Sequence, residues 1–200
     1  MDFLFMTELL SYGIFVGIVF SAIGAAGGIL TSFGMISLFG VIDPNSVKPM
    51  TQIIVLVTAL TFVPGYLRRS ALVLPLGLLL GGGGLAGAYA GSTLSSLYLS
   101  DMSTFKPLFG VLTLLVAAQI IWKLVRGARS AAANPVAASV SDVSLTPALL
   151  RFSYGTTQYR IPTWSPVLAG ALIAMIAAIF GVGGGFLLVP YMATILTMPM

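Results

Sequence analysis

Long apolar runs separated by short polar segments dominate the chain. Five stretches contain no charged residue: 9–42, 49–67, 70–100, 107–122 and 161–200. A helix that spans a bilayer needs about 20 apolar residues, so most of these runs are long enough to cross. The fourth run is short, but Lys106 and Lys123 beside it can extend their charged ends to the interface. The pattern therefore predicts an all-α, polytopic transmembrane protein.

A cluster of glycines interrupts the first run and the last run. The two clusters are Gly24-Ala25-Ala26-Gly27-Gly28 and Gly181-Val182-Gly183-Gly184-Gly185. Matching Gly24 to Gly181 also matches Gly13 to Gly170. Because glycine costs about 1 kcal/mol relative to alanine inside a helix, each cluster predicts a broken helix. Paired breaks of this kind in corresponding halves are typical of the binding site of a secondary transporter.

The first run leaves two arrangements open. It covers residues 9–42, which is too long for one straight crossing and short for two. We expect a half-helix on each side of the glycine break near residues 24–28, arranged either as one broken span or as a re-entrant hairpin. The choice decides on which side the N-terminus lies and whether the two repeats are parallel or inverted.

The distribution of charge predicts an orientation in the membrane. Hydrophobic residues make up 58% of the chain and charged residues 7%, against about 25% charged in soluble domains. Arg68 and Arg69 follow the second run, and five further basic residues lie between the fourth run and the fifth. Two crossings separate these groups, so the positive-inside rule places loops 68–70 and 126–162 in the cytoplasm of a multi-pass inner-membrane protein. The net charge of +4 is spread over these loops, which predicts a lipid bilayer and no nucleic acid as partner.

The chain divides into three predicted parts. Residues 1–125 form a first transmembrane repeat, and residues 126–162, with turn signals such as Thr146-Pro147, form a cytoplasmic linker. Residues 163–200 begin a second repeat. We expect this second repeat to be incomplete, because the chain stops before any counterpart of residues 44–124.

The third run carries glycines on one helical face. Gly83, Gly87 and Gly91 recur at four-residue spacing. Small residues at this spacing allow two helices to approach closely in lipid. We interpret this face as a packing surface rather than as a substrate contact.

The inventory of reactive side chains argues against an enzyme. The chain has no cysteine and no histidine, and its five carboxylates lie near the N-terminus or between the apolar runs. We therefore expect no catalytic residue, no metal site and no bound cofactor. Without a carboxylate at mid-membrane depth, the chain also gives no indication of a proton relay.

Backbone N–H groups at the glycine breaks favour a small anion as substrate. Such groups at helix N-termini bind anions, and glycines allow a close approach to the backbone. The candidate binding residues are Gly24, Gly27, Gly28, Thr51, Gln52, Gly181, Gly183, Gly184 and Gly185. The alternative is that the glycines only permit tight helix crossing, and that Thr51 and Gln52 only cap a helix after Pro49. Lys48 can attract anions from the outer side or can be a simple interfacial lysine.

Several of these motifs resemble one family of membrane permeases. The segment from Phe180 to Pro190, the run from Leu74 to Gly91 and the sequence Phe109-Gly110-Val111-Leu112 are similar to the TauE/SafE sulfite exporter family. The first glycine cluster is a degenerate copy, with Ala25 and Ala26 at positions where the family often has glycine. The resemblance implies transport of sulfite or of another sulfur-containing or organic anion, without a bound cofactor.

These observations together predict a permease that moves a small anion by alternating access around its glycine-broken helices. Two alternatives use the same elements. An anion channel would need no conformational cycle, and a truncated fragment or a membrane subunit would not transport at all. A homo-oligomer is compatible with the sequence.

Overall fold

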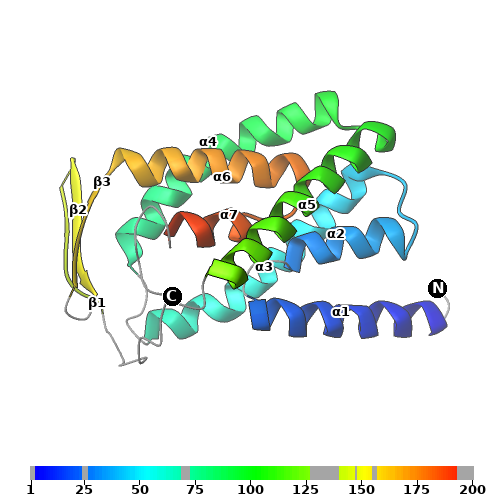
Figure 1. Ribbon diagram of the computed structural model, residues 1–200, viewed down its shortest axis with the longest axis horizontal. Coiled ribbons are helices and arrows are strands. Elements are labelled where there is room, and N and C mark those ends of the chain that lie inside the picture. The colour runs from blue at the N-terminus through cyan, green and yellow to red at the C-terminus, as the bar shows by residue number, and fades with distance from the viewer. Residues whose placement is uncertain are drawn as a thin grey trace.

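The computed structural model describes residues 3–23, 27–68, 73–126, 140–146, 148–154 and 157–192. Within these ranges the chain forms seven helices and three strands (Figure 1). The helices are α1 (Phe3–Ile23), α2 (Gly27–Ser37), α3 (Pro44–Arg68), α4 (Leu74–Tyr98), α5 (Met102–Arg126), α6 (Trp164–Phe180) and α7 (Gly185–Pro190). The strands are β1 (Val140–Leu145), β2 (Leu149–Tyr154) and β3 (Thr157–Pro162).

Four helices are long and apolar enough to cross a membrane. These candidate spans are Phe3–Phe20, Pro44–Gly65, Leu74–Tyr98 and Met102–Gln119. They expose many large apolar side chains, for example Leu56 and Leu60 on α3 and Leu114 on α5. Side chains of this kind on the outside of a helical bundle suit lipid rather than water. The expected multi-pass helical architecture is confirmed.

The glycine ladder of α4 packs directly against α6. A Cβ placed on Gly83 would lie 1.9 Å from the carbonyl oxygen of Val167, and one on Gly87 would lie 1.9 Å from that of Ala171. Ser95 continues the ladder and donates a hydrogen bond to the Ile179 carbonyl at 2.6 Å. Because the partner on α6 advances by one turn for each turn of α4, the two helices are parallel. The packing interpretation of this face is confirmed.

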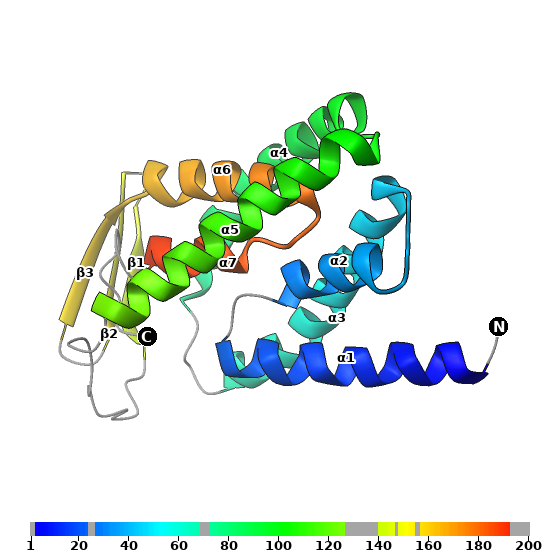
Figure 2. The same cartoon turned by 45° about the vertical axis from the view of Figure 1, so that its right-hand side comes forward.

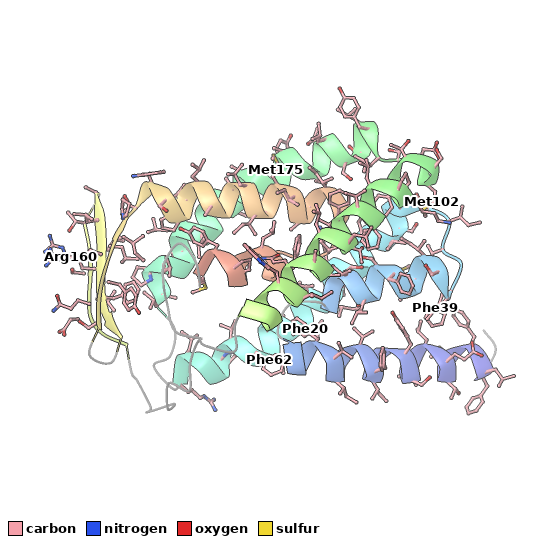
Figure 3. The ribbon with its side chains drawn as sticks, in the orientation of Figure 1. Phe20, Phe39, Phe62, Met102, Arg160 and Met175 are labelled. Carbon is pink, nitrogen blue, oxygen red and sulfur yellow. The ribbon has the colours of Figure 1, made fainter. Side chains whose placement is uncertain are left out.

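A three-stranded antiparallel sheet lies at one end of the helical bundle, in the order β1-β2-β3 (Figure 2). Alternate residues of β2 and β3 face the helices and are buried: Leu150 pairs with Ile161, and Phe152 pairs with Tyr159, whose ring stacks on it at 5.3 Å. Arg160 points away from the helices on the outer face (Figure 3).

This sheet was not predicted, since residues 126–162 were expected to act only as a linker within an all-α protein. The alternation of apolar and polar residues over 150–153 and 159–161 is the strand pattern that could have indicated it. Its buried face packs on Leu76 of α4 and Tyr191 after α7, so these strands are stabilised by contacts with distant helices.

Candidate functional site

Helices α1 and α2 form an antiparallel hairpin, which decides the question that the sequence left open. Phe5 packs edge-on against Phe39, with ring centroids 5.7 Å apart. Further along, the Tyr12 hydroxyl donates a hydrogen bond to the Leu30 carbonyl at 2.5 Å. The contacts converge towards the connection between the helices, as the two arms of a hairpin require. The first run is therefore a hairpin rather than one broken span.

Helices α6 and α7 form a second hairpin. Helix α6 ends at Gly181, which has a left-handed backbone with φ of 69° and donates its N–H to the Ala177 carbonyl. Gly183 also has a positive φ, of 76°. Glycine adopts these angles without steric cost, so both residues suit the reversal of the chain. The returning arm brings the Tyr191 hydroxyl within 3.1 Å of the Ser165 hydroxyl at the start of α6.

The two hairpins run in opposite directions. Helix α2 is antiparallel to both α1 and α3, and α4 returns in the direction opposite to α3 (Figures 1 and 2). Since α6 is parallel to α4, α6 is antiparallel to α1. The short arms α2 and α7 consequently enter the middle of the molecule from opposite ends, with their N-termini close to one another (Figure 1).

The two glycine segments touch at this central point. A Cβ on Gly28 would lie 1.8 Å from the Val182 carbonyl oxygen, a distance that no side chain tolerates. A Cβ on Gly27 would lie 2.7 Å from the Phe20 ring. Both glycines are buried. In the first hairpin, Gly27 and Gly28 therefore allow the Phe20 ring and the Val182 backbone to pack closely against them. This agrees with the alternative in which the glycines only permit tight helix crossing.

The second glycine segment lines a cleft of about 550 Å³. Gly183, Gly184 and Gly185 form one wall, and Gln52 and Val55 of α3 contribute to another. Most of the remaining lining comes from small or apolar residues of α4 and α6. Among the nine sequence-predicted binding residues, the cleft thus brings four together: Gln52, Gly183, Gly184 and Gly185.

The start of α7 leaves backbone donors next to this cleft. The Gly184 carbonyl accepts hydrogen bonds from Leu187 at 3.1 Å and Leu188 at 2.9 Å, which closes the first turn. The N–H groups of Gly185 and Phe186 lie in this first turn, where helical geometry provides no intrahelical acceptor for them. They are the kind of group that binds an anion.

Four other candidate residues lie elsewhere. Gly27 and Gly28 are packed as described, and Gly181 rests on the backbone and side-chain stem of Lys48. Thr51 is fully buried, with its hydroxyl 3.1 Å from both the Val47 carbonyl and the Ser32 hydroxyl. Gly24 falls outside the described residues.

Thr51 and Gln52 do not cap a helix, so that alternative is wrong. Helix α3 begins at Pro44 and continues through Pro49, which places both residues inside it. Asp43 holds the capping position instead, because its carboxylate accepts hydrogen bonds from the Asn45 N–H at 3.0 Å and the Ser46 hydroxyl at 2.7 Å. These bonds hold the pKa of the Asp43 carboxyl below its usual 3.8.

Asp101 plays a matching part before α5. The Ser103 hydroxyl and N–H donate to its carboxylate at 2.5 Å and 3.2 Å, and these bonds lower its pKa. Asp43 and Asp101 lie in connections at the same end of the bundle. Within the described ranges, no group of three or more acidic, histidine or cysteine side chains could hold a metal ion.

Sequence reasoning missed three buried polar residues around the site. The sequence suggested that Lys48 either attracts anions from the outer side or lies at the membrane interface. In the structure it is buried, with only 7% of its surface exposed. Ser95 follows the spacing of Gly83, Gly87 and Gly91, so the ladder could have revealed it. Ser32 carries no sequence signal, because its partner Thr51 is brought to it only by the fold.

Comparison with known proteins places this arrangement in a family. The search of curated proteins and the search of solved structures give no match. The family described as "Sulfite exporter TauE/SafE" matches residues 9–200, which cover all the described helices and strands except the first six residues of α1. Glycine-broken hairpins in a multi-pass helical bundle agree with such a transporter. The chain therefore belongs to the TauE/SafE sulfite exporter family of membrane transporters.

Proposed function

We propose that the protein is a permease that carries sulfite, or a similar small sulfur-containing or organic anion, across the inner membrane. The observation that carries this proposal is the cleft that Gln52 lines together with Gly183, Gly184 and Gly185. An amide and free backbone N–H groups can both donate hydrogen bonds to oxyanion oxygens. The small residues around them leave room for a substrate.

The anion binds at the second glycine segment, and the first segment supports it from behind. Gly28 rests against the Val182 carbonyl, so the α1–α2 hairpin fixes the backbone from which the binding groups project. This division assigns Gly183, Gly184, Gly185 and Gln52 to the substrate. It assigns Gly27, Gly28, Gly181 and Thr51 to the support.

The opposed hairpins support a mechanism of alternating access. Between the cleft and the connection at residues 99–101, the bundle is filled by apolar side chains that include Phe105, Phe109 and Phe186. With loops 68–70 and 126–162 in the cytoplasm, this filling closes the outer end. Movement of one hairpin against the other would open it and close the inner path.

The test is uptake of sulfite into proteoliposomes that contain the full-length protein, with chloride and acetate as comparison anions. We expect uptake that saturates with sulfite concentration and exceeds that of both comparison anions. Flux that rises linearly with concentration would favour the channel alternative. Absence of sulfite flux from protein shown to be folded would remove sulfite as the substrate.

A pair of variants connects the flux to the cleft. Gln52→Ala removes the only side-chain amide among the residues that line it, so we expect slower sulfite uptake through a higher KM. Gln119→Ala is the matched control, because Gln119 is a second glutamine in a membrane span, on α5, away from the cleft lining. Equal loss in both variants would contradict the assignment of Gln52.

A further inference from the structure

Lys48 is a buried cation held only by neutral groups. Its Nζ donates to the Leu99 carbonyl at 3.2 Å and to the Asn45 side-chain oxygen at 3.4 Å. The same Nζ lies 5.2 Å from the centroid of the Phe105 ring, within the range of a cation–π contact. These contacts tie α3 to the connection between α4 and α5 and to the first turns of α5.

The ammonium group makes no direct ion pair, and Asp43 acts on it only through space. Among the described residues, no carboxylate oxygen lies within 4.0 Å of it. Asp43 is nearby in sequence, but its side chain is exposed and occupied by Asn45 and Ser46. Because its direct contacts are all with neutral groups, an oxyanion that reached the ammonium would exchange a neutral acceptor for a charged one, which makes a stronger hydrogen bond.

Lys48 also lies next to the proposed substrate site. A Cβ on Gly181 would lie 2.7–2.8 Å from the Cα, Cβ and Cγ atoms of Lys48, so its stem rests on the turn that leads into the binding segment. Gln52 is four residues further along α3, one helical turn away on the same face. The ammonium therefore lies one turn beyond the cleft, beside the apolar filling that includes Phe105.

We propose that Lys48 is the latch of the outer gate and that the transported anion releases it. In the closed gate, the ammonium holds the Leu99 carbonyl. When the anion moves outward from Gln52, the ammonium pairs with it and gives up that carbonyl, which frees the 99–101 connection from α3. This inference rests on the proposed function, because the releasing ligand is the substrate anion.

A single cysteine reports the state of this gate. The natural chain has no cysteine, so Ser32→Cys introduces the only thiol. Ser32 is fully buried next to Thr51, one turn from Lys48 along α3. A membrane-impermeant thiol reagent added to spheroplasts reaches it only when the outer end opens. Ser103→Cys, exposed at the same end, checks that the reagent reaches this side.

The latch is tested with Lys48→Met in the Ser32→Cys protein. Methionine retains most of the stem that rests on Gly181 and removes the charge. We expect labelling of the thiol to become about tenfold faster, since the closed state loses its polar tie. Lys106→Met is the matched control, because Lys106 is an exposed lysine at the same end, and should leave the rate unchanged. Equal rates in the two variants would overturn the proposal.

Sulfite itself supplies a second readout, measured with the natural Lys48 and with Lys48→Met. In the Ser32→Cys protein, sulfite should accelerate labelling, and in the Lys48→Met variant it should have no further effect. If sulfite is transported but leaves the labelling rate unchanged, the latch is wrong and the permease stands. If sulfite is not transported while Lys48→Met still accelerates labelling, the substrate assignment fails and the latch tie stands.

Discussion

In the α1–α2 hairpin the glycines at the start of the short arm are buried against other parts of the chain, whereas in the α6–α7 hairpin they form the wall of a cleft. Gly28 meets the Val182 carbonyl directly. The nearest atom to a Cβ on Gly184 would be a methyl carbon of Ile173, at 3.1 Å. Similar sequence clusters therefore face different neighbours.

The difference shows how a repeated motif can divide its work. The first hairpin packs against the Val182 carbonyl and supports the second hairpin. The second hairpin lines the cleft with the backbone of its glycines. A glycine signature alone does not distinguish these uses, since both need the absence of a side chain. What separates Gly28 from Gly184 is the neighbour: Gly28 meets a backbone carbonyl, whereas Gly184 meets only a side-chain methyl group beside the cleft.

The largest effect is expected from Gly28→Ala. Its new methyl group would overlap the Val182 carbonyl, which cannot move without displacing the whole α6–α7 turn. We expect a loss of about 3 kcal/mol in the free energy of unfolding. The measurement is the yield of monodisperse protein in detergent and its melting temperature. Gly17→Ala on α1, where no atom lies within 4 Å, is the control. Similar yields for both variants would show that the close contact between Gly28 and Val182 is not needed for folding.

Gly184→Leu tests the second hairpin. The larger side chain would fill the cleft next to Gln52, and Ile173 can adjust because only a side-chain methyl lies close. We expect membrane insertion and folding to be retained while sulfite uptake is abolished. Gly82→Leu provides the matched control, because Gly82 is an exposed glycine of α4 with no atom within 4 Å. Normal uptake by a folded Gly184→Leu protein would refute the anion site.

Thr51→Val tests whether Thr51 supports the first hairpin rather than binding the anion. The substitution keeps the shape of the side chain but removes the hydroxyl contact with Ser32. Because both residues are fully buried, the Ser32 hydroxyl loses a partner, and we expect a cost of about 1–2 kcal/mol. Thermal unfolding measures this loss, and the KM for sulfite should stay unchanged. A raised KM with unchanged stability would return Thr51 to the binding site.

The smallest effect concerns Asp43, which follows the first hairpin. The pKa of Asp43 is lower in the folded protein than the usual 3.8. The ionised Asp43 carboxylate therefore contributes fully to the free energy of unfolding above the unfolded pKa. This contribution is lost as the pH falls through the folded pKa. Asp43→Asn should therefore flatten the decline in melting temperature between about pH 5 and about pH 3. An unchanged decline would show that other carboxylates cause it.

The helical spans were predictable because lipid imposes a simple requirement on composition. Runs of apolar residues must satisfy their backbone internally, and a helix does so within one segment. The small-residue ladder at Gly83, Gly87 and Gly91 was predictable for a similar reason, since its spacing defines one face of a helix. The sheet formed by 140–162 was missed because short strands depend on the surface that they cover.

The candidate site was only partly accessible to prediction. Gly183, Gly184 and Gly185 followed from their composition, and Gln52 from its position at the start of the second apolar run, just after Pro49. Lys48 was not recognised as buried, because its sequence neighbours Asn45 and Pro49 suggest an interface. Its burial depends on Leu99 and Phe105, which are about fifty residues away along the chain.

Three properties can be read from the amino-acid sequence alone: the chain spans a membrane, it belongs to a transporter family, and its helices are interrupted at two glycine clusters. These properties depend on composition and on local spacing, which act within one segment. The packing of the helices shows that each break lies between the arms of an antiparallel hairpin and that the two hairpins run in opposite directions. It also shows that Gly27 and Gly28 are packed while Gly183, Gly184 and Gly185 line a cleft. Those properties depend on which distant backbone lies against each glycine, and that is a matter of packing between helices.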